Sequence, residues 1–187
     1  MVLYVNAAPR ENSRTRKLAK AVLSHYQKEE IQEVRVFETD FPKLNEDFLR
    51  FRDEAVAKKD FSNGIFDLAK QFAKAEVVVI AAPYYDLSFP SALKQYFEQI
   101  NVIGLTFAYD DSGRCYSLCH LKKLHYCMTI GGKPYGPDCA YPYVCSLAEY
   151  FYNKPKCHLH KVERLDIEPG AEEKIAKAVE EILSEKY

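Results

Sequence analysis

Glycine-rich nucleotide-binding motifs are missing from this sequence of 187 residues, which contains only 7 glycines. Neither the dinucleotide fingerprint G-x-G-x-x-G nor the P-loop G-x-x-x-x-G-K-[ST] occurs in the chain. These two ways of holding a phosphorylated ligand are therefore excluded. Any phosphate site must be built from a loop of a different kind.

An excess of charge of one sign and a long apolar run are lacking as well. The formal net charge is −1, so the sequence has no electrostatic footprint for nucleic acid or for an anionic membrane. No apolar run approaches the ~20 residues that a membrane helix needs, and no signal-peptide pattern precedes the first predicted strand. We therefore expect a soluble, cytoplasmic protein that has neither a nucleic acid nor a membrane as its partner.

The 6 cysteines lack the close pairing that is typical of zinc ribbons and redox dithiols. The nearest approach to a metal cluster is Cys157, His158 and His160. In a strand, however, Cys157 would face one way and both histidines the other. The sequence thus predicts free thiols and no metal.

What the sequence does contain is one stretch, from Glu76 to Asn101, that joins a buried strand to a helix through an aromatic turn. Its run 77–82, VVVIAA, is apolar without alternation, as in a strand buried on both faces of a parallel sheet. Pro83 ends this strand because it has no amide hydrogen to donate. Pro90 fits the first turn of the helix that follows.

Two tyrosines, Tyr84 and Tyr85, follow the buried strand directly. Open α/β sheets bind their ligands at the carboxyl ends of the strands. The pattern therefore favours a platform for a flat, conjugated ring, although tyrosines at a strand end also commonly serve as packing residues.

Strands alternate with helices along the whole chain, which predicts one α/β domain over residues 1–187 with a doubly wound parallel sheet. The expected strands cover 2–5, 34–37, 77–82, 124–130 and 159–165. The expected helices cover 14–28, 61–74, 91–101, 143–152 and 171–186, with a charged, amphipathic stretch over 46–59. We expect 103–111 to be irregular and 110–113 to form a turn.

Two further loops should meet the aromatic turn at the carboxyl edge of this sheet. In the first, Ser13, Arg14 and Thr15 begin a helix and offer hydroxyls, free amides and the positive end of the helix dipole, which suits a phosphate monoester. The aromatic turn is the second loop in chain order, and in the third, at 129–132, Gly131 and Gly132 let the backbone come close to a ligand. Each loop also has a plainer interpretation, as an ordinary helix cap and as a turn that leaves the sheet.

The pattern A-P-Y-Y-D-L-S-F-P-S-A-L-K-Q-Y-F at 82–97 resembles the flavin-contacting turn and helix of the flavodoxin-like NAD(P)H oxidoreductases. These include the FMN-dependent azoreductases and the quinone reductases. The likeness also covers 3–18, 75–107 and 123–132. It implies a flavodoxin-like three-layer sandwich with a five-stranded parallel sheet in the order 2-1-3-4-5. It further implies FMN as the cofactor, with FAD less favoured, and a homodimer whose active sites lie at the subunit interface.

The resemblance also assigns cofactor-binding positions in this sequence. They are Ser13, Arg14 and Thr15 at the phosphate, Pro83, Tyr84, Tyr85, Asp86 and Leu87 along the ring, and Thr129, Ile130, Gly131 and Gly132 at its pyrimidine edge. Three positions depart from the family pattern. Ala7 stands where a phosphate-binding serine is frequent, Asp86 where an asparagine is frequent, and Ile130 where an arginine is frequent.

The implied reaction is a hydride transfer from NAD(P)H to the flavin N5 atom and on to a quinone, azo or nitroaromatic acceptor in a ping-pong cycle. The apolar slot for the acceptor would comprise Phe89, Phe107, Tyr109 and Tyr135, some of them contributed across the dimer. Tyr135 is our candidate for a catalytic acid, with His120 and His125 as alternatives.

Two other functions fit the sequence. A flavodoxin-type electron carrier or redox-sensing flavoprotein would bind FMN without rapid turnover of NAD(P)H, but carriers of this type are usually strongly acidic. A flavin-free binding module would use the tyrosines for packing alone. The sequence does not distinguish NADH from NADPH, and it does not identify the natural acceptor.

Overall fold

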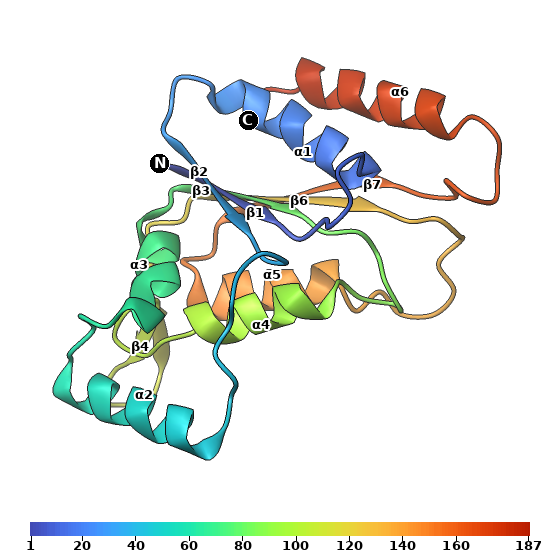
Figure 1. The fold of residues 1–187 in the computed structure, drawn as a ribbon. Coiled ribbons are helices and arrows are strands. Elements are labelled where there is room, and N and C mark those ends of the chain that lie inside the picture. The colour runs from blue at the N-terminus through green and yellow to red at the C-terminus, as the bar shows by residue number, and fades with distance from the viewer.

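The computed structural model describes residues 1–187, which fold around a five-stranded sheet in the order β2-β1-β3-β6-β7 (Figure 1). The strands are β1 (Val2–Asn6), β2 (Ile31–Arg35), β3 (Val77–Ala81), β6 (Lys123–Thr129) and β7 (Lys156–Val162). Every neighbouring pair in this sheet is parallel. The predicted flavodoxin-like order 2-1-3-4-5 is therefore confirmed.

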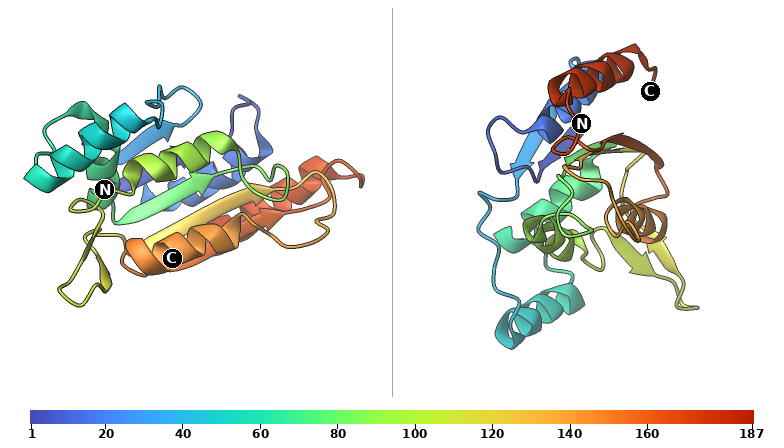
Figure 2. Two further views of the ribbon diagram at one scale, coloured as in Figure 1. Left: turned by 90° about the horizontal axis from the view of Figure 1, so that it is seen from below. Right: turned by 90° about the vertical axis from the view of Figure 1, so that its right-hand side faces the viewer.

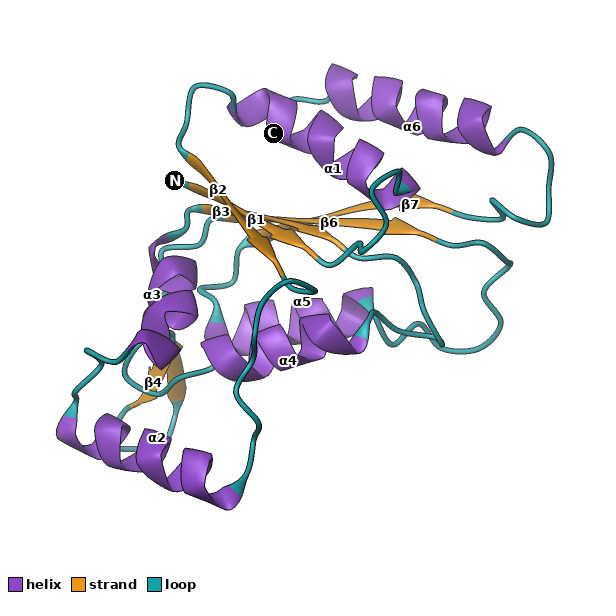
Figure 3. Ribbon diagram, viewed as in Figure 1, coloured by secondary structure: helices purple, strands orange, loops and turns teal.

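Helices cover both faces of the sheet and make three layers (Figure 3). One face carries α1 (Arg14–Leu23) and α6 (Ala171–Ser184), and the other carries α3 (Asp67–Lys74), α4 (Ser91–Ile100) and α5 (Tyr141–Phe151). All five residues of β3 are buried. Val78 and Ile80 pack into the larger core beneath α3, α4 and α5, while Val77 and Val79 pack into the smaller core beneath α1 and α6. A strand between two apolar layers needs no polar face, which explains its unbroken apolar run.

The segments outside these layers lie towards the end of the sheet where its strands begin (Figures 1 and 2). They are α2 (Glu46–Lys58) and an antiparallel hairpin of β4 (Phe107–Tyr109) and β5 (Cys115–Ser117). The charged, amphipathic stretch expected at 46–59 forms the helix α2, and Asn45 caps it by accepting a hydrogen bond from the Phe48 amide at 2.9 Å. None of its residues is buried.

The hairpin corrects the prediction that 103–111 is irregular. Its strands have three residues each, too short for an alternating pattern to stand out in the sequence. The turn predicted at 110–113 is present, because the Gly113 amide donates to the Asp110 carbonyl at 2.8 Å.

Several element boundaries differ from those predicted. The helix expected over 14–28 ends as an α-helix at Leu23 and continues as the 3-10 turn η1 (Ser24–Tyr26). The helix expected over 61–74 begins with the 3-10 turn η2 (Gly64–Phe66), and α5 starts at Tyr141 because Pro142 fits its first turn. The strands expected at 34–37 and 159–165 are β2 and β7, each starting three residues earlier. Both are edge strands with mostly unburied residues, so their sequences mark no clear limits.

The alternation along β7 is as predicted. Cys157 packs against the larger core, whereas His158 and His160 lie on the other face and stack on His125 of β6. The two ring-centroid distances are 4.8 and 5.4 Å.

The described helices include none that combines the length and the apolar character required to cross a lipid bilayer.

Candidate functional site

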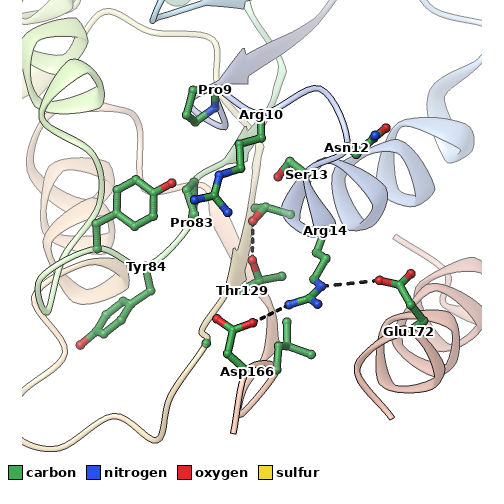
Figure 4. Close-up of a pocket in the computed structure, with 14 residues that line it drawn as sticks. Pro9, Arg10, Asn12, Ser13, Arg14, Pro83, Tyr84, Thr129, Asp166 and Glu172 are labelled. Carbon is green, nitrogen blue, oxygen red and sulfur yellow. Dashed lines mark hydrogen bonds and ion pairs between the residues drawn. The ribbon is translucent and has the colours of Figure 1, made fainter. Parts of the chain in front are cut away.

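A cavity of about 640 Å³ opens where β1, β3 and β6 end, and it is lined by all three loops singled out above (Figure 4). From those loops it takes Ser13, Arg14, Thr15, Pro83, Tyr84, Tyr85, Thr129 and Gly131. The convergence has a simple cause. The three strands are parallel neighbours at the centre of the sheet, so their carboxyl ends open onto the same edge.

The first loop presents unpaired amides to the cavity. Ser13 caps α1, since its Oγ accepts from the Arg16 amide at 3.4 Å while its carbonyl accepts from the Lys17 amide. The amides of Arg14 and Thr15 have no backbone partner, as expected for the first turn of a helix. Together with the helix dipole, these amides favour an anion.

A pair of hydroxyls ties the first loop to the third. Thr15 Oγ1 lies 2.5 Å from Thr129 Oγ1, in a hydrogen bond that either side chain can donate. Thr15 is buried. The contact holds the start of α1 against the end of β6.

The third loop is arranged so that its carbonyls are paired and its glycine amides are left unpaired. The carbonyls of Ile130, Gly131 and Gly132 accept from the amides of Leu165, Asp166 and Arg164 respectively. The amides of the two glycines have no backbone partner and can donate to a ligand.

The missing side chain of Gly131 leaves room for Asp166. A Cβ atom at this position would meet the Asp166 carboxylate, so a larger residue would force that carboxylate to move away from its place beside Arg14.

The aromatic turn is a tight two-residue hairpin. The Tyr85 and Ser88 amides each donate to the other's carbonyl at 2.8 Å. Between them, Asp86 and Leu87 have positive φ values of 49° and 65°. This geometry matches a type I′ turn, which normally favours asparagine or glycine. Its strained backbone fixes where Tyr85 lies in the cavity wall.

Ion pairs moderate the positive charge of the cavity. Arg14 Nη1 lies 2.8 Å from Asp166 Oδ1, and Arg14 Nε lies 3.5 Å from Glu172 Oε1 (Figure 4). Glu172 also pairs with Lys17 at 2.6 Å, and the hydrogen bond from Lys17 lowers the pKa of the Glu172 carboxyl. Because two carboxylates face Arg14, the groups left free to attract an anion are the amides and hydroxyls of the first loop and the side chain of Arg10, which also lines the cavity.

Four of the predicted cofactor positions do not line this cavity. Asp86 lines a neighbouring pocket, and Leu87 and Gly132 lie in the loops beside the cavity. Ile130 is 5% exposed and packs into the larger core, while its amide donates to the Val162 carbonyl in β7. The Ile130 side chain, at the position where the family frequently has an arginine, thus points away from the cavity.

The residues predicted for the acceptor slot are spread over the molecule. Phe89 lines the neighbouring pocket. Phe107 and Tyr109 belong to β4, towards the opposite end of the sheet (Figure 1), so they do not line the cavity of their own chain. Tyr135 is 76% exposed and its ring lies 5.6 Å from the Lys133 ammonium.

The two histidines named as alternative acids do not reach the cavity. His125 is 0% exposed and is hydrogen-bonded to Tyr26 and His160. The His120 amide donates to the Ala73 carbonyl, near the end of the sheet where the strands begin. Neither histidine therefore lines the cavity of its own chain.

Six lining residues are not among the predicted cofactor positions. Pro9, Arg10 and Asn12 belong to the loop before α1, and the other three lie outside the three predicted loops. Leu165, Asp166 and Glu172 reach the cavity from the segment after β7 and from the start of α6. No motif marks them. The one available signal is Gly131, whose missing side chain makes room for Asp166.

A family model described as a flavodoxin-like fold matches residues 1–185. A protein of Coprothermobacter proteolyticus named FMN-dependent NADH:quinone oxidoreductase is 34% identical over 178 residues, which cover 89% of this chain and 87% of the relative. The chain belongs to the flavodoxin-like oxidoreductase family. A flavodoxin-like relative of the same name from Clostridium perfringens is 31% identical over 98% of this chain and 96% of its own length.

The solved structures agree with this family. The crystal structure of an azoreductase from Bacillus anthracis superimposes with a TM-score of 0.78 at 26% identity. The match covers 97% of this chain and 96% of that one. The resemblance inferred from residues 82–97 is thereby confirmed for the flavodoxin-like family.

Proposed function

We propose that the chain is an FMN-dependent oxidoreductase that passes a hydride from NADH to a flat acceptor such as a quinone, an azo compound or a nitroaromatic, in a ping-pong cycle. The observation that carries the proposal is the single cavity lined by Ser13, Tyr85 and Gly131 from three separate loops. Related proteins of nearly the same length bear the name FMN-dependent NADH:quinone oxidoreductase. When bound, FMN supplies the N5 atom that accepts the hydride and returns it.

The free groups of the cavity fit this cofactor. Ser13, Arg14 and Thr15 would hold the phosphate through two hydroxyls and the unpaired amides of α1. FMN carries a single phosphate and needs no glycine-rich loop for a pyrophosphate. The lack of such a loop in this chain is therefore compatible with FMN.

The second and third loops would hold the ring. Pro83 and the turn from Tyr84 to Leu87 would lie along its face. At its pyrimidine edge the chain offers the unpaired amide of Gly131 and the hydroxyl of Thr129, with the unpaired amide of Gly132 in the same loop beside the cavity, while the paired backbone of Ile130 holds the loop in place. Unpaired amides there stabilise the negative charge that gathers at this edge on reduction.

Anaerobic mixing with NADH tests the proposal directly. The FMN-loaded protein is expected to lose its flavin absorption band within the mixing time or shortly after, and to recover it when a quinone is added. The band recorded with buffer in place of NADH is the control. Bleaching that requires an added reductase would identify an electron carrier instead, and a protein that stays colourless after FMN is added would contradict flavin binding.

A homodimer is part of the same proposal. Tyr109 is 52% exposed on the hairpin, far from its own cavity, and Phe107 supports its ring at a centroid distance of 5.7 Å. A partner subunit's hairpin could bring such a tyrosine to the acceptor slot, beside Phe89 and Tyr135. Tyr135 remains the proposed proton donor.

The mass in solution checks this arrangement. We expect a mass of twice 21.6 kDa at micromolar concentration. A protein of single-chain mass with full activity would contradict a shared active site. The proposal also includes a cytoplasmic location.

A further inference from the structure

A second pocket of about 650 Å³ adjoins the first. The proposed flavin and acceptor sites use Tyr85, Asp86 and Phe89 of its lining and leave the rest of the pocket unassigned. The two pockets share Pro9 and Tyr85 as lining residues. The second pocket continues over Phe37, which follows β2, over Phe89 beside the start of α4, and over Tyr143 of α5. A ligand that fills both pockets would pass across the Tyr85 turn.

The walls of this second pocket suit a flat ring. Phe89 is held in place by Phe97 and Tyr143, with ring-centroid distances of 5.8 and 5.6 Å. Phe37 is a large apolar side chain that is 46% exposed, whereas its neighbour Val36 is buried in the larger core. Aromatic faces of this kind bind bases by stacking.

Two charged groups lie among these aromatic walls. Lys94 Nζ lies 5.9 Å from the centre of the Tyr143 ring and 2.5 Å from Glu98 Oε1. Asp86, held at positive φ in the turn, lines the pocket beside Tyr85. The pocket therefore offers stacking surfaces, one cation and one carboxylate.

We propose that this second pocket binds the adenosine half of NADH while the nicotinamide half lies in the first cavity. The inference rests on the proposed function and adds the site of the donor's remote half. A dinucleotide has two separate flat ring systems joined by a long linker, whereas a quinone has a single flat ring system, which must lie at the flavin. The two adjoining pockets match the dinucleotide.

Asp86 should let the site distinguish NADH from NADPH. A carboxylate can accept a hydrogen bond from the ribose 2′-hydroxyl of NADH, and it repels the 2′-phosphate of NADPH. Lys94 lies on the α4 side of the pocket and can attract the pyrophosphate. The pocket therefore favours NADH over NADPH.

A truncated donor separates this inference from the proposed function. Reduced nicotinamide mononucleotide lacks the adenosine half, so changes in the second pocket should not alter how it binds. In the FMN-loaded variant Phe37→Ala, the KM for NADH is expected to rise about 5- to 100-fold, the range for losing one base-stacking contact. The KM for the truncated donor should stay within about twofold of the wild-type value, since the pocket makes no contact with it.

A matched control is available in Phe51→Ala. Phe51 is 45% exposed, like Phe37, but lies on α2 away from both pockets. Its replacement should leave both KM values unchanged. In Asp86→Asn, the ratio of the KM for NADPH to the KM for NADH should fall, and using the ratio cancels any effect on the flavin itself.

The outcomes are distinguishable. Suppose that both donors reduce the wild-type protein. If Phe37→Ala then raises the KM for NADH and the KM for the truncated donor equally, or leaves both unchanged, the proposed adenosine site is wrong, while the proposed function stands. If neither donor reduces the wild-type protein, the proposed function fails and the inference falls with it.

Discussion

Replacing Ser13 and Thr15 together by alanine is expected to weaken FMN binding by roughly 2–4 kcal/mol, or about 30- to 1000-fold. Each hydroxyl would lose a hydrogen bond to a charged phosphate, which is worth about 1.5–3 kcal/mol at most, and the two losses add up to less than twice this value because the amides that remain still bind the phosphate. The unpaired amides of Arg14 and Thr15 remain in the variant, so binding is weakened rather than abolished. Titration of the apoprotein with FMN, followed by quenching of the flavin fluorescence, measures the change.

Both hydroxyls already have partners in the structure, which shapes the expected result. Ser13 Oγ accepts from the Arg16 amide, so its hydrogen remains free to be donated to a phosphate. Thr15 shares one hydrogen bond with Thr129, and Thr15→Ser should keep it and retain most of the affinity.

The control for a general weakening of α1 is Ser24→Ala. Ser24 Oγ donates to the Ala21 carbonyl at the far end of the same helix, away from the cavity. This variant should bind FMN like the wild type. Unchanged affinity in the Ser13 and Thr15 double variant would refute the phosphate site.

The sequence could predict the centre of the site because each part of it has a local signal. Val77 to Ala82 identify a strand buried on both sides, and Ser13 identifies the start of a helix. Parallel topology then forces the loops after β1, β3 and β6 to one edge, since these strands are neighbours. Regular alternation of strands and helices was enough to place the three loops together.

The rest could not be predicted because its signals are not local. Asp166 and Glu172 reach the cavity from beyond an edge strand, and their role depends on Arg14, about 150 positions away in the sequence. Phe37 resembled part of a strand, but it is exposed beside the second pocket. Tertiary packing decides such contacts, and no spacing in the sequence encodes them.

A buried histidine cluster beneath α1 and α6 is expected to make the fold sensitive to acid. His125 Nδ1 lies 3.1 Å from His160 Nε2, and its other ring nitrogen lies 2.9 Å from the Tyr26 hydroxyl. The ring of Tyr187 stands edge-on over His125 and His160, with centroid distances of 4.5 and 5.8 Å. This packing leaves little room for hydration of a charged imidazole.

The pKa values of these histidines give the direction of the effect. Burial lowers the pKa of His125 from 6.5 to about 3 and that of His160 to about 4. Charged groups around the cluster are Lys123 and Lys156, which lower histidine pKa values, and Glu185, which raises them. Between pH 6.5 and 4 the unfolded chain therefore binds more protons than the folded one. The cluster's contribution to stability is complete above pH 6.5 and is lost as the pH falls towards 4.

Urea unfolding at pH 7.0 and pH 4.5 measures this loss. We treat His125 and His160 as one coupled unit because they are hydrogen-bonded to each other. The free energy of unfolding is then expected to fall by on the order of 3 kcal/mol between pH 7.0 and pH 4.5 because of this cluster. Other carboxylates and histidines also titrate there, so the informative quantity is the difference from the variant His125→Gln, His160→Gln. This variant should be less stable at pH 7.0, because it disrupts buried hydrogen bonds, yet it should lose less stability on acidification.

The exposed His120 supplies the matched control. His120→Gln removes a histidine outside the cluster and should leave the acid dependence of the wild type unchanged. If the double variant loses as much stability as the wild type between pH 7.0 and pH 4.5, the buried histidines do not govern the acid response. Since the cluster lies beneath α1, whose first turn forms the phosphate site, acid loosening of α1 should also release FMN. Fluorescence of freed flavin over the same pH range is therefore expected to rise in the wild type before it does in the double variant.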